Sequence, residues 1–271
     1  MPDTPGGWRE ELLTAYDAQL RADAEVVGAE IWDHVGPLWR AVYRHGGFVS
    51  YESLEGLGDV AAVDALIAET IAYFEGFPQV EEFEWKTRGH DWPPDLDQRL
   101  RAHGLVPEEV ETVMIGEATR LAVDVHIPDG VAVRRIDLVP DRDRIVGEAA
   151  EMQREVFGDG PSAEDVLARL DLMDGLDEFW VAEVDGRVIS AGRLTRVAGT
   201  EFAGLWGGAT VPRWRQRGVY RALTAARARS AIASGVRYLH SDCTAMSRPI
   251  LERSGLVAVT TTTPYKWHRG G

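Results

Sequence analysis

Apolar and polar positions between residues 217 and 234 repeat with the period of an α-helix. Four apolar residues fall at the i, i+3, i+4 and i+7 positions of one face: Val219, Ala222, Leu223 and Ala226. Polar residues occupy other angles: Arg221, Thr224, Arg227 and Arg229. The preceding segment 202–211 is apolar, glycine-rich and bounded by turn residues, as a buried strand is. The pattern predicts a strand, a short connection and a helix.

The same periodicities extend over the rest of the second half. They predict further strands over 131–138, 178–184, 187–197, 236–242, 256–262 and 264–268, and further helices over 141–156, 163–172 and 247–254. Asp185-Gly186 stands between two apolar runs and predicts a β-hairpin.

The first half has fewer periodic segments. Their apolar patterns predict helices over 8–26, 63–77 and 94–103, and strands over 82–87 and 110–115. A break falls at 117–131, where Pro128-Asp129-Gly130 has turn chemistry. We therefore expect two domains, residues 1–120 and residues 131–271.

The two halves share an internal repeat. A shift of 151 residues places Asp91 on Asp242, Leu100 on Leu251, Gly104 on Gly255, Leu105 on Leu256, Val106 on Val257 and Thr112 on Thr263. Both copies have a strand, a polar turn, a short helix ending in Leu-x-x-x-Gly-Leu, and another strand. We expect the second copy to repeat the structure of the first.

The composition excludes several classes of function. The chain has 271 residues, of which 45% are hydrophobic, and a formal net charge of −15, which disfavours nucleic acid as a partner. No stretch reaches the roughly 20 apolar residues of a membrane span, and no leader pattern opens the chain. We therefore expect a cytoplasmic monomer or homodimer without a membrane partner. The single cysteine, Cys243, excludes an internal disulfide and offers no metal cluster.

A basic connection precedes the predicted helix 217–234. Arg213, Arg215 and Arg217 lie beside Gln216 there, in an otherwise acidic chain. Backbone N–H groups at a helix start have no intrahelical partner, and Gly218 has no Cβ to keep an anion away from them. By spacing alone, the connection is either a site for a small anion such as pyrophosphate or a solvated turn.

The run Arg215-Gln216-Arg217-Gly218-Val219-Tyr220 resembles the R/Q-x-x-G-x-G/A signature of the GNAT superfamily, the acyl-CoA-dependent N-acyltransferases. The similarity covers residues 131–267 and includes the segment 247–256, which resembles the last helix of that family. It implies an α/β (α+β) fold of two GNAT-like mixed-sheet domains with splayed central strands. Residues 55–62 have acidic neighbours in place of the signature, so only the C-terminal domain has a complete cofactor motif.

The resemblance also implies a substrate and its binding residues. The co-substrate is acetyl-CoA or another acyl-CoA, without a metal, and the acceptor is the amine of a small molecule that attacks the thioester directly. The expected acyl-CoA-binding residues are Ala209, Thr210 and Val211 for the pantetheine arm, Arg215, Gln216, Arg217, Gly218, Val219 and Tyr220 for the pyrophosphate, and Ser247. Ser247 is alternatively a helix N-cap.

The catalytic residues depart from the family pattern. Leu251 stands where many members have a tyrosine that donates a proton, and Tyr220 replaces a small residue of the signature. We expect Asp242 or His240 as the base and Tyr265 as a substitute acid. The alternatives are a cap or turn at Asp242, a packing role for His240 and a sheet anchor at Tyr265. A non-catalytic CoA-binding or sensory protein is the rival function.

Overall fold

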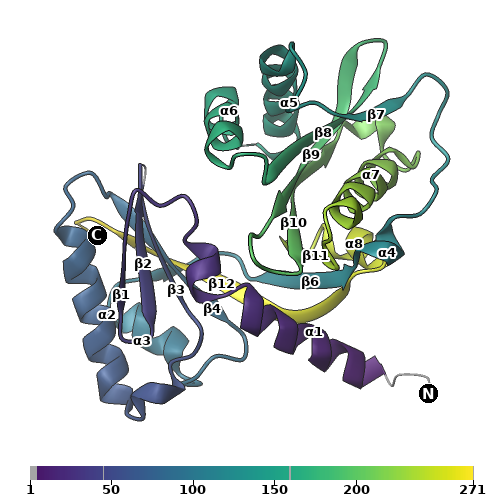
Figure 1. The fold of residues 1–271 in the computed structure, drawn as a ribbon. Coiled ribbons are helices and arrows are strands. Elements are labelled where there is room, and N and C mark those ends of the chain that lie inside the picture. The colour runs from purple at the N-terminus through teal and green to yellow at the C-terminus, as the bar shows by residue number, and fades with distance from the viewer. Residues whose placement is uncertain (1–4, 45, 159, 271) are drawn as a thin grey trace. The chain divides into compact units, whose positions relative to one another are not determined.

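The computed structural model describes residues 5–44, 46–158 and 160–270, which form two compact units (Figure 1). The first unit comprises Met1–Met114, Asp242–Pro249 and Ala258–Gly271, and the second comprises Ile115–Ser241 and Ile250–Val257. Among the described residues, no helix is both long enough and apolar enough to cross a membrane.

The first unit has a mixed sheet in the order β1-β2-β3-β4-β12, and β5 also pairs with β12. Its strands are β1 (Ile31–Val35), β2 (Leu38–Tyr43), β3 (Gly46–Tyr51), β4 (Glu82–Arg88), β5 (Val106–Pro107) and most of β12 (Val257–His268). Its helices are α1 (Pro5–Gln19), α2 (Val60–Glu75) and α3 (Leu96–Ala102), with 3₁₀ turns η1 (Ala22–Glu25) and η2 (Glu55–Leu57). Strands β3 and β4 are parallel, and the other pairs are antiparallel.

An aromatic core holds the first unit together. Phe74 of α2 stacks on Phe83 of β4 with ring centroids 4.4 Å apart, and Phe83 stacks on Trp267 of β12 at 5.3 Å. Trp85 of β4 is fully buried in the same cluster. The last strand of the chain therefore completes the core of its first unit.

The second unit has the sheet order β11-β10-β9-β8-β7. Its strands are β7 (Ala132–Arg135), β8 (Asp177–Val184), β9 (Arg187–Arg196), β10 (Phe202–Thr210) and most of β11 (Tyr238–Cys243). Its helices are α4 (Ala118–Leu121), α5 (Arg142–Phe157), α6 (Ala163–Leu172) and α7 (Val219–Ala233), with the 3₁₀ turn η3 (Pro212–Trp214). The chain crosses between the units within β6 (Glu111–Glu117), within β11, within α8 (Arg248–Ser254) and at the start of β12.

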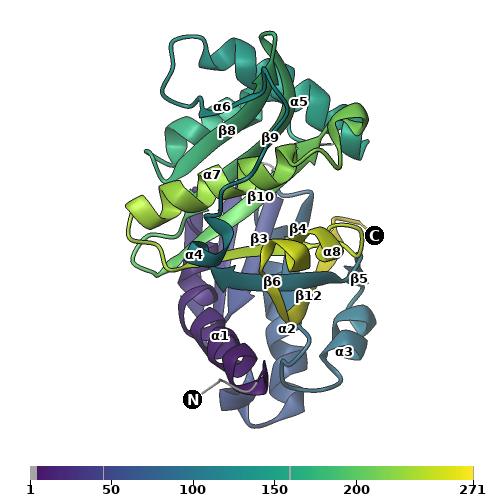
Figure 2. The same ribbon diagram turned by 90° about the vertical axis from the view of Figure 1, so that its right-hand side faces the viewer.

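Alternating side chains bury both faces of this second sheet. Val181 and Val188 pack with α5 and α6, whereas Ala182 and Ile189 pack with Val219 at the start of α7. Because successive strand residues point to opposite faces, α5 and α6 cover one face and α7 covers the other (Figure 2).

The internal repeat is present in the backbone hydrogen bonds. The amide of Leu105 donates to Leu100 at 3.0 Å, and the amide of Leu256 donates to Leu251 at 3.1 Å. Each unit also has a parallel strand pair with a helix between the two strands: β3-α2-β4 in the first, and β10-α7-β11 in the second. The two units therefore share one mixed α/β topology.

Three expectations from the sequence were wrong. The predicted strands 256–262 and 264–268 are one strand, β12, whose antiparallel pairing with β4 continues through Pro264. Because residues 258–271 pack in the first unit, the predicted domain 131–271 does not describe the second unit. The predicted helix 8–26 ends at Gln19, and η1 follows it.

Candidate functional site

Two parallel strands separate at the centre of the second unit. Strands β10 and β11 are paired at Phe202–Tyr238, Ala203–Leu239 and Gly204–His240. Beyond these pairs, a side chain replaces the ladder, because the Ser241 hydroxyl donates to the carbonyl oxygen of Leu205 at 3.0 Å. The rest of β10 therefore has an edge that β11 does not cover within the described residues, as the splayed-strand expectation requires.

A bulge marks the same part of β10. The pairing of β10 with β9 shifts register between Trp206 and Ala209, and Gly207 has φ +59°, a left-handed conformation that suits glycine. Gln153 of α5 donates to the Gly207 carbonyl oxygen at 2.5 Å, and the Ser190 hydroxyl donates to that of Ala209 at 2.6 Å. Side chains of neighbouring elements therefore fix the irregular backbone.

The 215–220 loop leads from the end of β10 into α7. Gln216 has φ +61°, which is uncommon for a residue other than glycine, and Gly218, the N-cap of α7, has φ +82°. No side chain caps the first amides of α7 within the described residues. These amides and the positive end of the helix dipole remain available to an anion.

Glycine at position 218 has a structural reason in addition to the one expected. A Cβ there would lie 2.6 Å from the carbonyl oxygen of His126, which belongs to the connection between α4 and β7. The glycine therefore lets this connection cross closely over the loop, and its left-handed φ is the second requirement.

The arginines of the loop region are not neutralised. Among the described residues, none with a carboxylate forms an ion pair with Arg213, Arg215, Arg217 or Arg221, and the stretch 202–241 contains no aspartate or glutamate. Arg215 donates through Nε to the Thr210 carbonyl oxygen at 3.0 Å, and the Arg217 guanidinium lies over Trp214, 5.3 Å from the ring centroid. These contacts orient positive charge without cancelling it.

His240 lies where the two strands separate. Its ring is buried, 7% exposed, and meets the edge of Trp206 at a centroid distance of 5.3 Å. The Trp206 indole fills the space that a side chain on Gly204 would need. Of the three catalytic candidates, His240 is the one that shares a unit with the loop.

Asp242 belongs to the first unit and is engaged in an ion pair. Its carboxylate lies 2.7 Å from Nζ of Lys86, which also lies 3.2 Å from Glu25. Burial alone would lower the pKa of Lys86, but Asp242 and Glu25 outweigh that effect and raise it. The Asp242 carboxylate is therefore engaged by the Lys86 ammonium within the first unit.

Tyr265 and Ser247 also lie in the first unit. The Tyr265 hydroxyl donates to Asp97 at 2.5 Å, and burial together with this bond raises the pKa of Tyr265. A phenol that already donates to a carboxylate is a poor acid. The Ser247 amide donates to the Thr244 carbonyl oxygen at 3.1 Å, within a turn before α8.

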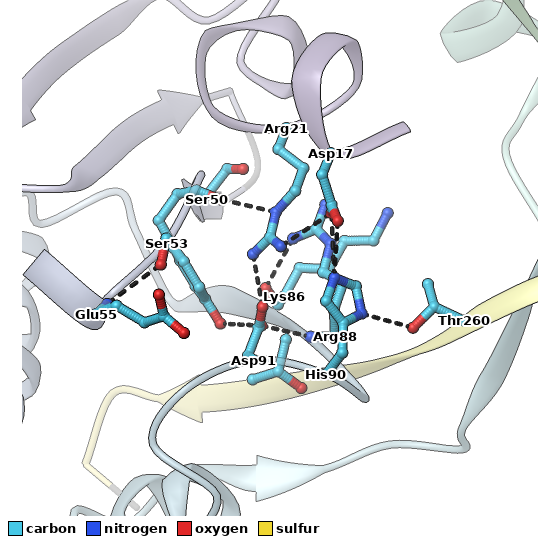
Figure 3. A network of polar contacts seen from close by, with 12 residues as sticks. Asp17, Arg21, Ser50, Ser53, Glu55, Lys86, Arg88, His90, Asp91 and Thr260 are labelled. Atoms are coloured by element: carbon cyan, nitrogen blue, oxygen red, sulfur yellow. Dashed lines mark hydrogen bonds and ion pairs between the residues drawn. The ribbon is translucent and has the colours of Figure 1, made fainter. Parts of the chain in front are cut away.

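In the first unit, the equivalent strand gap is filled by the chain itself. Strands β3 and β4 are paired through Val49–Trp85, and beyond that point Arg21 and Glu25 contact the ends of the two strands. Figure 3 shows Arg21 in its polar network with Asp17 and Asp91. Arg21 donates through Nε to the Tyr51 carbonyl oxygen at 3.0 Å, and Glu25 accepts from Arg88 of β4 at 2.5 Å.

The helix that corresponds to α7 is also capped from within. Asp59, the N-cap of α2, accepts a hydrogen bond from the Ala61 amide at 3.0 Å. This carboxylate occupies the place of an anion and would repel a second one. The gap between β3 and β4 and the start of α2 are therefore both occupied by side chains of the first unit itself, where the signature is missing.

Comparison with known proteins adds the fold family. No protein-family model and no curated protein matches the chain. Among solved structures, a GCN5-related N-acetyltransferase from Kribbella flavida is similar, with a TM-score of 0.66 and 14% identity over 100% of this chain and 98% of that one. A GCN5-related N-acetyltransferase from Sphaerobacter thermophilus has a TM-score of 0.59 and 18% identity over 86% and 76%.

A third similar structure is a tandem GNAT protein from the clavulanic acid biosynthesis pathway. It has a TM-score of 0.60 and 13% identity over 86% of this chain and 79% of that one. The chain has the tandem GNAT fold, which confirms the fold that the sequence resemblance implied.

Two residues of the second unit were missed or misplaced by sequence reasoning. Gln153, which holds the bulge, has no local signal, because its partner Gly207 is far away in the sequence. Arg227 was assigned to the polar side of its helix, but it is fully buried. Its spacing of four and eight residues from Leu223 and Val219 places it on the buried face and could have revealed this.

Proposed function

We propose that this protein transfers an acyl group, most simply acetyl, from acyl-CoA to the amine of a small molecule. One observation carries the proposal: the uncapped start of α7 and its unneutralised arginines follow directly on the part of β10 that β11 leaves open, and Tyr220 of α7 lies against Gly208 there. That combination provides an anion site and, next to it, an open strand edge able to hydrogen-bond an extended amide-containing chain.

Each part of acyl-CoA then has a proposed partner. The amides of Val219 and Tyr220, with Arg217 beside them, bind the pyrophosphate, and the edge of β10 at Ala209–Val211 binds the amides of the pantetheine arm. The bulge at Gly207 turns the strand at the point where the thioester would follow.

The chemistry is direct attack by the amine on the thioester carbon. His240, at the last pair of the parallel strands, is the proposed base that accepts the amine proton. A backbone N–H of the bulge, at Ala209, is the proposed donor to the oxygen on which negative charge develops. The amide product and CoA then leave.

Charge reversal in the loop tests the acyl-CoA site. We expect Arg217→Glu to weaken CoA binding at least tenfold in calorimetry, because it removes a charged contact worth about 1.5–3 kcal/mol and adds repulsion. Arg44→Glu makes the same charge change at an exposed turn of the first unit and should leave the affinity unchanged. Wild-type protein should bind one CoA per chain, because the first unit's gap is filled; unchanged affinity in Arg217→Glu would refute the placement.

Release of free thiol from acetyl-CoA, measured across a panel of small amines, tests the reaction itself. Thiol release that depends on an amine supports acyl transfer. Saturable CoA binding without release for any amine would instead support a CoA-binding sensory protein, in which Tyr220 takes the place of a small residue beside the bulge.

A further inference from the structure

A positive charge is buried beneath α7 without a counter-charge. The Arg227 side chain is 0% exposed, and its guanidinium donates to the carbonyl oxygen of Arg193 at 3.0 Å and to the Thr224 hydroxyl at 3.3 Å. It forms no ion pair with any residue in the described part of the chain. Burying an uncompensated ion costs several kcal/mol, so its retention calls for a reason beyond packing.

The hydroxyl of Tyr220 is the ionisable group that faces this guanidinium. Burial lowers the pKa of Arg227, and the nearby phenol of Tyr220 counteracts part of that effect. Tyr220 precedes Arg227 by seven residues, which places both side chains on one face of α7. Tyr220 as a whole residue is only partly buried.

Two glycines on adjacent strands make room for this pair. A Cβ on Gly208 of β10 would lie 2.8 Å from the Tyr220 hydroxyl oxygen, and a Cβ on Gly192 of β9 would lie 2.7 Å from Nη1 of Arg227. Any larger residue at either position would displace the phenol or the guanidinium. The phenol is thereby held against the bulge of β10, next to Ala209.

We propose that Tyr220 protonates the departing sulfur of the acyl-CoA thioester and that Arg227 is a positioning residue that stabilises the resulting phenolate. The inference rests on the proposed function. As the tetrahedral adduct collapses, the C–S bond breaks and its electron pair stays on sulfur, which takes the Tyr220 proton to give the free thiol of CoA. The phenolate regains a proton from water, and the proton lost by the amine leaves through His240.

The other tyrosine of the second unit does not fit this role. Tyr238 lies at the far end of the parallel pairing, stacked with Phe202 at 5.1 Å and under the Arg237 guanidinium at 4.6 Å. The Tyr220 hydroxyl, by contrast, lies against Gly208, beside the bulge of β10 where the thioester is proposed to lie.

The test separates binding from turnover in Tyr220→Phe, which keeps the ring against Gly208 and removes only the hydroxyl. With acetyl-CoA and an amine that supports thiol release by the wild type, we expect kcat to fall about 100-fold, at the lower end of the range for general acid catalysis, because a thiolate is a good leaving group. The Kd of CoA should stay within about twofold. Tyr73→Phe is the control, since the Tyr73 hydroxyl makes no hydrogen bond to a described residue.

Arg227 is tested by charge removal and rescue. Arg227→Met, like Tyr220→Phe, should lower kcat while the Kd of CoA stays nearly unchanged. Arg227→Lys should restore part of the lost kcat. Circular dichroism reports whether each variant is folded. A Tyr220→Phe enzyme with unchanged kcat would overturn the inference alone, whereas a wild-type protein that does not bind CoA, or binds it without thiol release, would overturn the proposed function as well.

Discussion

Buried arginines have different partners at the filled strand gap of the first unit and beneath α7 of the second. In the first unit, buried arginines have carboxylate partners, such as Arg21 with Asp91 at 2.7 Å and Arg88 with Glu25 at 2.5 Å. In the second unit, Arg217 has no carboxylate partner within the described residues, and Arg227 is buried without one. The paired charges hold a filled gap closed, whereas the unpaired charges remain available for an anionic ligand and for a phenolate.

The paired charges predict a pH dependence of stability. Burial alone would raise the pKa of Glu25, but Arg88 and Lys86 outweigh this effect and lower it from 4.5 to about 2. A lowered carboxyl pKa stabilises the folded state above the unfolded value, and this contribution disappears as the pH falls from about 4.5 to about 2.

We therefore expect Glu25→Gln to lower the free energy of unfolding at pH 7 by about 3 kcal/mol, and the deficit to shrink as the pH is lowered towards 2. Urea denaturation at a series of pH values measures the loss of unfolding free energy and its dependence on pH. Glu30→Gln, at an exposed site, should show neither effect. A deficit that does not depend on pH would contradict the assignment.

At the scale of secondary-structure elements, the two helices α2 and α7 differ in how they begin. Both follow a 3₁₀ turn, but Asp59 caps α2 with its own carboxylate, whereas α7 begins at Gly218 without a side-chain cap. One helix start is satisfied internally, and the other is left for a ligand.

Gly218→Ala tests the start of α7. The substitution places a Cβ 2.6 Å from the His126 carbonyl oxygen at φ +82°, so we expect a loss of about 1–3 kcal/mol in stability and weaker CoA binding. Gly147→Ala is the matched control, because Gly147 lies inside α5 with nothing within 4 Å of its added Cβ. That change should stabilise the protein by about 0.5–1 kcal/mol. Thermal unfolding and calorimetry distinguish the two; equal behaviour would contradict the strained loop.

At the scale of the whole molecule, the last strand belongs to the first folded unit. Trp267 of β12 is 7% exposed and packs in the same core as Phe74 of α2. Trp267→Ala should cost about 3–5 kcal/mol and raise hydrogen exchange in α2 rather than in α5. Phe179→Ala, in the core of the second unit, should do the reverse. Faster exchange confined to α5 in Trp267→Ala would instead support a domain made of residues 131–271.

Local patterns predicted much of the secondary structure. Helix α6 was predicted over 163–172 and is observed at Ala163–Leu172, where Ser162 and Asp165 form a capping box. Strands β1 to β3 were not predicted, because charged residues such as Asp33 and Arg40 interrupt their apolar alternation and pair with each other across the strands.

The sequence by itself determined the basic loop, its glycine, the repeat and the fold family, because each is written in neighbouring residues or in a regular spacing. The tertiary structure alone decided that β12 completes the first unit, that residues 21–25 fill that unit's strand gap, and that Lys86 holds Asp242. It also placed Tyr220 and Arg227 in the space left by Gly208 and Gly192. These features depend on burial and on contacts between residues far apart in the chain, for which local periodicity carries no information.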